Sequence, residues 1–336
     1  MKEEKTISSV GEFELIRSCF SSSVPSDVTG ITVGLGDDGA VLDVPRTQEL
    51  VVSTDTLVEG IHFSSDDDPY LLGRKALRVN LSDLAAMGAQ PRWYLLSLSL
   101  PPSTPLSWVT EFSRGLKEDG ERYKVALTGG DTTGSKGCRI MTITMMGYLG
   151  KGRALCRSGL QLGDRLFVTG TLGDATLGLA HHLGRMTLSD SEDAIYLMQR
   201  HQLPEPRIAF GMGLIDAALA HGAIDLSDGL VADLRHLCTA SKVGAEVDVE
   251  KIPLSHAARR QLEAHDGDLL TQILTGGEDY ELLFAVSPGC LGAVANLADQ
   301  MGLAITEIGV VTAGSSVNFN LNGTPMRLGS GGWTHF

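Results

Sequence analysis

The sequence predicts a two-domain protein of the mixed α/β class. Its 336 residues are more than one hydrophobic core usually holds. Segments with strand character alternate with segments of helical periodicity in both halves, as in mixed α/β folds. A basic, glycine-rich stretch without periodicity, Gly150–Asp164, separates the halves. We therefore expect domains at residues 1–150 and 151–336, each built around a mixed sheet.

In the N-terminal half, the clearest element is a helix over Pro69–Gly88. Apolar residues recur every three or four positions from Leu72 to Val79, Asp83 continues the same stripe, and the final glycine is a natural stop. The other elements expected here are helices at 11–20 and 106–123, and strands at 40–44, 49–53, 93–100, 125–128 and 139–149.

In the C-terminal half, the clearest element is a helix over Asp228–Ala240. Its apolar residues Leu230, Leu234, Leu237 and Cys238 fall on one face. Residues 184–206 are polar and carry two prolines, so part of this stretch is expected to be loop. The remaining predictions are strands at 165–169 and 281–286, and helices from about 174 and over 291–301.

The composition excludes several classes of function. Hydrophobic content of 43% and charged content of 20% are typical of a globular enzyme. The net charge of −14 argues against nucleic acid or an anionic membrane as partner. Five widely spaced cysteines without a C-x-x-C pair indicate a reducing compartment and neither a disulfide framework nor a zinc site. With no secretory signal and no apolar run long enough for a membrane span, we expect a cytoplasmic protein.

The placement of the acids is the strongest functional signal. All but Asp83 are expected in short Gly-, Ser- and Thr-rich breaks between apolar segments, which surface acids do not require. Two like charges 4 Å apart repel by about 4 kcal/mol at an effective dielectric near 20, against a typical stability of about 5–15 kcal/mol. Convergence of such carboxylates therefore indicates divalent cations, and Mg²⁺ prefers oxygen ligands. These acids are Asp37, Asp38, Asp55, Asp83, Asp131, Asp225, Asp228, Glu278 and Asp279.

Asp83 is the sharpest single candidate because it lies on the apolar stripe of its helix. An aspartate is rarely buried without a partner, since an unpaired buried carboxylate costs several kcal/mol. The side chain is short, so the alternative of reaching solvent is poor. We expect it to meet a cation or a dense set of hydrogen bonds, with Asn80 one turn earlier to assist.

Hydroxyl-rich and glycine-rich strings surround the other acids. Ser53–Thr56 follows an apolar strand, where α/β proteins collect ligands; a helix N-cap cluster is the alternative. Gly129–Asp131 and Gly276–Glu278 each place two glycines before an acid, and consecutive N–H groups of that kind bind anions. Gly36–Gly39, around two aspartates, is equally compatible with an exposed turn.

Two features of the sequence indicate a phosphate-binding site. Asp225, Ser227 and Asp228 open a predicted helix; an N-cap explains only one of them, and a helix N-terminus favours phosphate. The guanidinium group of Arg157 presents several N–H donors in one plane, which suits phosphate binding. The alternative is that Arg157 is an exposed arginine of a linker. The chain lacks a Walker A motif and a G-x-G-x-x-G fingerprint, and no Ser-His-Asp spacing or metal-type Cys/His cluster stands out. These residues predict a multi-magnesium enzyme acting on a nucleotide phosphate.

The motifs together resemble one known family. They are GDDGAVL, STDTLVEGIHF, KALRVNLSDLAAMGAQP, LTGGDTT, RSG, VTGTLGD, AIDLSDGL, GGEDYEL and the terminal GGWTHF. In this order, over about residues 11–336, the chain resembles the thiamine-monophosphate kinase family, of the superfamily of aminoimidazole-ribonucleotide synthetase and selenophosphate synthetase. The resemblance implies that residues 1–150 bind ATP and magnesium and pair their sheet with a second subunit in a barrel-like homodimer. It implies an α/β sandwich at 151–336 that completes the active site.

The resemblance also implies a role for each matching residue. Magnesium ligands are expected at Asp38, Ser53, Thr54, Asp55, Asp83, Asp131, Asp225 and Asp228, of which Asp83, Asp131 and Asp228 are also expected to be catalytic. ATP contacts are expected at Tyr123, Gly130, Arg157 and Ser227, and substrate contacts at His62, Glu278 and Trp333. The indole of Trp333 suits this role because an aromatic face attracts a cationic ring.

The implied reaction transfers the γ-phosphoryl group of ATP to thiamine phosphate in a single in-line step, with several Mg²⁺ ions. The acceptor is already ionised near neutral pH, which agrees with the lack of an evident general base. Two alternatives stay open from the sequence. One is another ATP-dependent synthetase of the same superfamily, and the other is an ATP- and magnesium-binding sensor without transfer.

Overall fold

The computed structural model describes residues 5–20, 28–188, 190–265, 268–329 and 332. The chain divides into two compact units. Unit 1 contains Met1–Leu84 and Ala89–Gly152, and unit 2 contains Ala85–Gly88 and Arg153–Phe336. The predicted two-domain, mixed α/β class is confirmed, with a mixed sheet in each unit.

Unit 1 is built on a four-stranded sheet in the order β3-β6-β4-β5. The β4 and β5 strands are parallel, and the other neighbours are antiparallel. Within the described residues of one chain this sheet is open and does not close into a barrel. Its elements are η1 (Ile7–Ser9), α1 (Glu12–Cys19), β1 (Ile31–Val33), β2 (Val41–Leu42), β3 (Gln48–Val58), α2 (Pro69–Met87), β4 (Gln90–Leu100), α3 (Leu106–Tyr123), β5 (Ala126–Gly134) and β6 (Ile140–Gly150).

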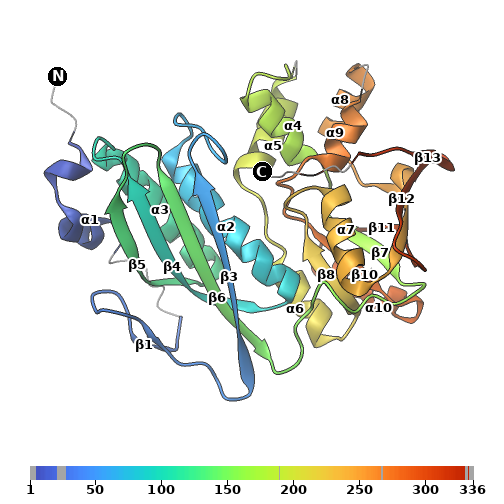
Figure 1. Ribbon diagram of the computed structural model, residues 1–336, viewed down its shortest axis with the longest axis horizontal. Coiled ribbons are helices and arrows are strands. Elements are labelled where there is room, and N and C mark those ends of the chain that lie inside the picture. Colours follow the sequence, from blue (N-terminus) through green and yellow to red (C-terminus); the bar gives the residue numbers. More distant parts are fainter. Residues whose placement is uncertain (1–4, 21–27, 189, 266–267, 330–331, 333–336) are drawn as a thin grey trace. The chain divides into compact units, whose positions relative to one another are not determined.

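The two faces of this sheet have different cover. Helices α2 and α3 lie against one face (Figure 1), where Met141, Ile143 and Met145 of β6 are buried. We call the opposite side the open face. At one end it is covered by the β1–β2 ribbon, through Val28 and the neighbouring apolar side chains. On the outer strand β3, beside this covered cluster, Leu50 and Val52 are 48% and 54% exposed.

Helices α2 and α3 pack closely because each has a glycine at the crossing. A Cβ atom on Gly73 would lie 2.2 Å from the carbonyl oxygen of Phe112, and one on Gly115 would lie 2.1 Å from that of Tyr70. A buried ion pair joins the same helices, since Arg78 Nε donates to Asp119 Oδ2 at 2.6 Å. The helix layer that supports the sheet is therefore held by both backbone contact and charge.

Two predicted loops of unit 1 prove to be strand. The expected strand at 49–53 continues to Val58, so Ser53–Thr56 lies inside β3. The expected strand at 125–128 continues to Gly134, so Gly129–Thr133 lies inside β5. The cause is tertiary pairing, because β6 and β4 supply hydrogen-bonding partners along both stretches. The paired glycines of β5 therefore do not form the predicted anion nest.

Unit 2 is built on a seven-stranded sheet in the order β13-β12-β9-β11-β7-β10-β8. The β12 and β9 strands are parallel, and the other neighbours are antiparallel. Its elements are β7 (Arg165–Thr169), α4 (Asp174–His182), α5 (Ser191–Gln202), α6 (Ile208–Asp216), β8 (Ala220–Asp225), α7 (Leu230–Ser241), β9 (Gly244–Asp248), η2 (Val249–Lys251), α8 (His256–Ala264), α9 (Leu269–Thr275), β10 (Leu282–Val286), η3 (Pro288–Cys290), α10 (Leu291–Gln300), β11 (Ile305–Thr312), β12 (Val317–Leu321) and β13 (Thr324–Met326).

Helix α7 supplies the main helical contribution to the core of unit 2. The predicted apolar face is buried, with Leu230, Leu234, Leu237 and Cys238 packed against strand residues such as Val168. A second apolar cluster, which includes Leu177, Leu197, Ala258 and Ile273, joins α4, α5, α8 and α9. Among the described helices, none has the length and apolarity needed to cross a membrane.

Candidate active site

In unit 1, β3 and α2 bring Ser53 and Asp83 together. The Ser53 hydroxyl donates to Asp83 Oδ2 at 2.5 Å. One turn earlier on the helix, Asn80 Oδ1 accepts from the backbone N–H of Asp55 at 3.1 Å. Ser53 and Asp55 are two positions apart in the strand, so their side chains share the face that meets α2. Asp83 has the polar partner that its half-buried position requires.

These groups form a set of hard oxygen donors that fits magnesium. The set comprises the Ser53 hydroxyl and the carboxylates of Asp55 and Asp83. Across the described part of the chain, no three His, Cys, Asp or Glu side chains gather in a way that could hold a metal by themselves. Magnesium in phosphate-transfer sites commonly takes one or two carboxylates, with water and substrate phosphate as its other ligands. The donor set matches that smaller requirement.

The pairing register places Thr54 and Asp131 on the open face. Thr54 Oγ1 donates to the carbonyl oxygen of Ile143 at 3.1 Å and lies 3.1 Å from Thr144 Oγ1. Asp131 pairs with Ser97, which continues the row of outward side chains through β4 and β6. Asp131 therefore faces away from the side of the sheet that carries Asp55.

Asp55 and Asp131 also lie on opposite edges of the sheet. β3 and β5 are its two outer strands, with β6 and β4 between them. Three inter-strand spacings separate the outer strands by roughly 14 Å. Within one chain, these two carboxylates are therefore too far apart to share one metal ion.

The remaining predicted residues of unit 1 lie at loops and element ends. Asp38 is exposed in the turn between β1 and β2. His62 accepts the backbone N–H of Val58 at Nδ1, at 3.0 Å, which leaves Nε2 as the protonated nitrogen of its neutral ring. Tyr123 ends α3, with the guanidinium carbons of Arg78 and Arg122 at 5.5 and 5.3 Å from its ring centroid.

Gly130 has a steric role in β5. Its φ is +155°, and a Cβ atom there would lie 1.9 Å from the carbonyl oxygen of Leu96 on the neighbouring strand. Any side chain would force β4 and β5 apart beside Asp131. The glycine is thus required by the close approach of two backbones, whatever ligand this edge of the sheet meets.

In unit 2, the loop Asp225–Gly229 is joined to the loop Gly276–Glu281. The backbone N–H of Glu278 donates to the carbonyl oxygen of Ser227 at 2.9 Å, and that of Tyr280 donates to Leu226 at 2.9 Å. A Cβ atom on Gly277 would lie 2.0 Å from the carbonyl oxygen of Ser227. This close approach explains why the second residue of the pair is a glycine.

Asp233, which the sequence reasoning missed, holds the first of these loops. Its Oδ2 accepts the backbone N–H of Asp228 at 3.1 Å. Burial, together with the nearby charge of Asp228, raises the pKa of Asp233 to about 7, and the positive charge of Arg157 opposes that rise. Arg157 is exposed. The charges of Arg157, a predicted phosphate-binding residue, and of Asp228, a predicted metal ligand, therefore both act on the carboxyl group of Asp233.

The second loop, Gly276–Glu281, has a strained backbone, and its acids Glu278 and Asp279 have different surroundings. Glu278 and Tyr280 have φ angles of +71° and +51°, in the left-handed region that side chains rarely adopt. Glu278 Oε2 lies 2.9 Å from Nδ1 of the buried His201. Asp279 points inward and accepts the N–H of Gly173 at 2.8 Å; burial is the main cause that raises its pKa to about 8.

A buried ionic network fixes the end of the same loop. Glu281 is fully buried and accepts from Arg207 Nε at 2.6 Å and from Arg200 Nη2 at 2.8 Å. The Thr169 hydroxyl donates to its Oε2 at 2.6 Å. Such a network compensates the burial of the carboxylate and holds the strained backbone beside Glu278. Sequence reasoning did not find it, because Arg200 and Arg207 come from separate helical segments.

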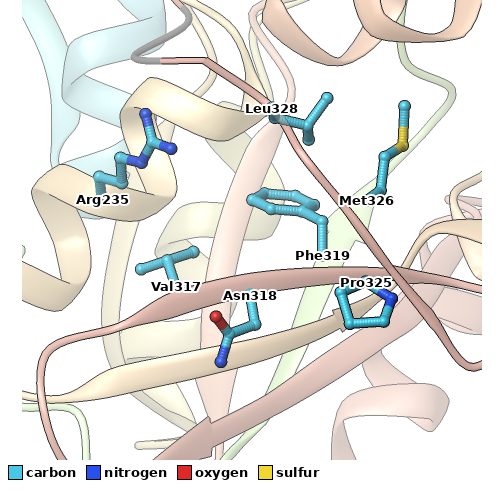
Figure 2. A pocket seen from close by; sticks show the side chains of 7 residues that line it. All are labelled: Arg235, Val317, Asn318, Phe319, Pro325, Met326 and Leu328. Atoms are coloured by element: carbon cyan, nitrogen blue, oxygen red, sulfur yellow. The ribbon is translucent and has the colours of Figure 1, made fainter.

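The C-terminal motif is partly described. Trp333 lies outside the described residues. Gly332 is described, and a Cβ atom there would lie 2.4 Å from Ala232 Cβ and 3.4 Å from the carbonyl oxygen of Asp228. The motif therefore reaches the beginning of α7. A cleft of about 70 Å³ nearby, between α7 and the β12–β13 hairpin (Figure 2), is much smaller than the roughly 300–1,000 Å³ of typical ligand pockets.

Comparison with known proteins identifies the family. The model of the AIR synthase related protein, N-terminal domain, matches residues 36–149, and that of the C-terminal domain matches residues 161–322. A thiamine-monophosphate kinase of Salmonella typhimurium is 46% identical over 327 residues, which cover 97% of this chain and 98% of that protein. The chain belongs to the thiamine-monophosphate kinase family.

Solved structures of this family have the same fold. The thiamine-monophosphate kinase of Stenotrophomonas maltophilia is 39% identical, with a TM-score of 0.80 over 89% of this chain and 93% of that chain. The structure of AaThiL complexed with AMPPCP and TMP is 34% identical, with a TM-score of 0.76 over the whole of both chains. The predicted membership of the thiamine-monophosphate kinase family is confirmed.

Proposed function

We propose that this chain phosphorylates thiamine phosphate at the expense of ATP, giving thiamine diphosphate and ADP. The observation that carries the proposal is full-length similarity to thiamine-monophosphate kinases, including AaThiL, which was solved with AMPPCP and TMP. The residues expected for this reaction include Asp83 and Ser53 on adjoining elements of unit 1, and Asp228 and Glu278 on joined loops of unit 2.

The transfer requires positioning and charge neutralisation more than proton removal. The acceptor oxygen belongs to a phosphate that is already ionised, so direct in-line transfer of the γ-phosphoryl group needs no strong general base. Magnesium, when bound, would neutralise the phosphates of both substrates. Asp38, Ser53, Thr54, Asp55, Asp83, Asp131, Asp225 and Asp228 would hold it, and Asp83, Asp131 and Asp228 are the proposed catalytic residues.

The substrates would be held by the other predicted residues. Tyr123, Gly130, Arg157 and Ser227 would contact ATP, and His62, Glu278 and Trp333 would contact thiamine phosphate. Arg157 is exposed and its charge acts on the Asp228–Asp233 region, which supports a role in binding phosphate there. Residues 1–150 would bind ATP and magnesium, and residues 151–336 would complete the active site.

We further propose a homodimer in which the open faces of two unit 1 sheets meet. Leu50 and Val52 expose apolar surface on that face, and among the residues that the structure describes both outer strands have unpaired edges. A second copy would bring β3 of one chain to β5 of the other. Asp55 and Asp131, which one chain holds roughly 14 Å apart, would then lie on neighbouring strands of different subunits and contribute to one active site.

We propose that the enzyme works in the cytoplasm, where ATP is available. The five cysteines are all free, which supports a reducing compartment.

A coupled ADP-release assay tests the proposed function. ATP turnover should depend on both thiamine phosphate and Mg²⁺, and thiamine diphosphate should form in equal amount to ADP. Turnover that ignores thiamine phosphate would instead support another synthetase of the superfamily. Tight ATP binding without turnover would support a sensor.

A further inference from the structure

The exposed segment that carries Arg157 is fixed between strand β8 and helix α7. We call residues 157–160 the Arg157 turn. Arg157, Ser158 and Gly159 are exposed, whereas Leu160 at the end of the turn is buried. Among the strands that the structure describes, β8 is the last of the seven-stranded sheet, and α7 lies beside it (Figure 1). The turn is therefore held from two directions, by the edge of a sheet and by a helix.

The contacts with β8 are made by the backbone. The N–H of Ala223 donates to the carbonyl oxygen of Cys156 at 3.1 Å. A Cβ atom on Gly222 would lie 2.8 Å from that same oxygen, and one on Gly159 would lie 2.5 Å from the carbonyl oxygen of His221. Because both glycines permit this close approach, the turn and the residue before it lie directly against the strand.

The contact with α7 is made by the hydroxyl group of Ser241, the last residue of the helix. This hydroxyl donates to the carbonyl oxygen of Arg157 at 2.9 Å and accepts from the backbone N–H of Leu160 at 3.3 Å. The two backbone groups are three positions apart, which is the spacing that a direct hydrogen bond joins in many β-turns. A hydroxyl has one donor and two acceptor positions, so Ser241 bridges the two groups and closes the turn.

The side chain of Arg157 acts on the loop at the opposite end of α7. Burial raises the pKa of Asp233, and the positive charge of Arg157 opposes that rise. Asp233 Oδ2 in turn accepts the backbone N–H of Asp228 at 3.1 Å. The backbone of Arg157 is thus held at the C-terminal end of α7, while its charge acts near the N-terminal end. A change in the Arg157 turn would move the guanidinium group relative to the predicted metal and ATP residues of that loop.

We propose that Ser241 is a positioning residue that closes the Arg157 turn and thereby directs the guanidinium group of Arg157 to the phosphates of ATP. The inference rests on the proposed function, in which Arg157 contacts ATP. The contacts with β8 hold Cys156 and Gly159, whereas the bridge through Ser241 orients the carbonyl group of Arg157 itself. Ser241 is bonded to the backbone of the turn, so its effect on ATP is transmitted through Arg157.

Steady-state kinetics of Ser241→Ala test this role. Loss of the bridge should raise the KM for ATP about tenfold, while the KM for thiamine phosphate and the kcat change by less than about twofold. Ser241→Thr keeps the hydroxyl and should hold the KM for ATP within about twofold of wild type. The matched control is Ser113→Ala, which removes a hydroxyl that donates to the carbonyl oxygen of Thr110 at 2.9 Å within α3. The KM values of this control should stay at wild type.

A double-mutant cycle with Arg157→Ala separates positioning from general support of the fold. Arg157→Ala alone should raise the KM for ATP at least as much as Ser241→Ala does. If Ser241 acts through Arg157, Ser241→Ala should cause no further increase once the guanidinium group is gone. Independent effects in the double variant, or equal increases in the KM values for both substrates, would overturn the inference.

Binding of AMPPCP in the presence of Mg²⁺, measured by isothermal titration calorimetry, does not depend on turnover. Its Kd should rise about tenfold in Ser241→Ala and stay at the wild-type value in Ser113→Ala. An active wild-type enzyme with an unaffected Ser241→Ala variant would overturn this inference alone. A wild type that binds AMPPCP but cannot phosphorylate thiamine phosphate would overturn the proposed function, and the Kd values of the variants would still decide the role of Ser241.

Discussion

The hydroxyl of Ser53 donates to a carboxylate oxygen of Asp83 across 2.5 Å, and so joins the middle of β3 to helix α2. The bond orients a half-buried carboxylate beside the strand that carries Asp55. An acid held in this way is available to a cation without the entropy cost of ordering a mobile side chain.

Asp83→Asn should lower kcat by about a hundredfold or more, because the amide keeps the size of the side chain but removes the charge that would hold magnesium. Asp131→Asn should have a similar effect. Ser53→Ala, which removes only the orienting hydroxyl, should be milder. Turnover at millimolar MgCl₂ and thermal unfolding measure activity and fold together. Near-normal turnover of either asparagine variant would show that its carboxylate is not a catalytic ligand.

Subunit complementation tests the proposed dimer. A purified heterodimer of Asp55→Asn and Asp131→Asn chains, isolated with two affinity tags, should recover about half of the wild-type activity, because one of its two shared sites contains both intact carboxylates.

The matched control for this experiment is a heterodimer of Asp55→Asn and Asp83→Asn chains. Both substitutions fall in the same β3–α2 cluster, so each site keeps one defect and activity should stay low. Failure of the Asp55/Asp131 heterodimer to exceed this control would mean that the two acids do not meet across subunits.

Gly277→Ala should separate the two loops of unit 2. The added methyl group would lie 2.0 Å from the carbonyl oxygen of Ser227, so the backbone bond between Glu278 and Ser227 must shift. We expect kcat/KM for thiamine phosphate to fall by about a hundredfold. Gly289→Ala is the control, since its nearest neighbour to the new Cβ is 3.9 Å away. Equal activity of the two variants would contradict the importance of this close approach.

Asp279 should make the stability of the enzyme depend on pH. Its pKa is raised to about 8 in the folded chain, mainly by burial, against about 4 in an unfolded chain. Between these values the folded chain binds the extra proton, so stability falls as the pH rises through this window, by at most about 1.4 kcal/mol per pH unit.

Asp279→Asn cannot titrate and keeps an oxygen that can accept from Gly173. Its Tm relative to wild type should therefore rise between pH 5 and pH 8, as measured by differential scanning calorimetry. Parallel Tm curves for the two proteins over this range would show that Asp279 does not take up a proton on folding.

Elements with strong periodicity could be predicted from sequence. The helix expected at 69–88 is observed at Pro69–Met87, and the strand expected at 165–169 is observed at Arg165–Thr169. Their patterns are local, because burial of one face repeats at a fixed spacing along the chain. The apolar face of α7 followed from the same reasoning.

Strand pairing and buried charge could not be predicted in the same way. Ser53–Thr56 and Gly129–Thr133 are polar or glycine-rich and become strands only because distant segments pair with them. That pairing decides that Thr54 and Asp55 face opposite sides of the sheet. Asp233 could have been predicted from the sequence. It lies three positions after Leu230 on a buried helix face, and an aspartate on the apolar face of a helix is the same signal that identified Asp83.

The buried group formed by Glu281, Arg200 and Arg207 limits how this family member can diverge. Replacing Glu281 would leave two largely buried arginines without the carboxylate they share, and replacing either arginine would remove one of the two cations that compensate its burial. Exchanging all three for apolar side chains of similar volume is tolerable in principle. Drift at these positions is therefore expected to be concerted, and libraries built to alter substrate choice near Glu278 should vary the trio jointly or leave it untouched.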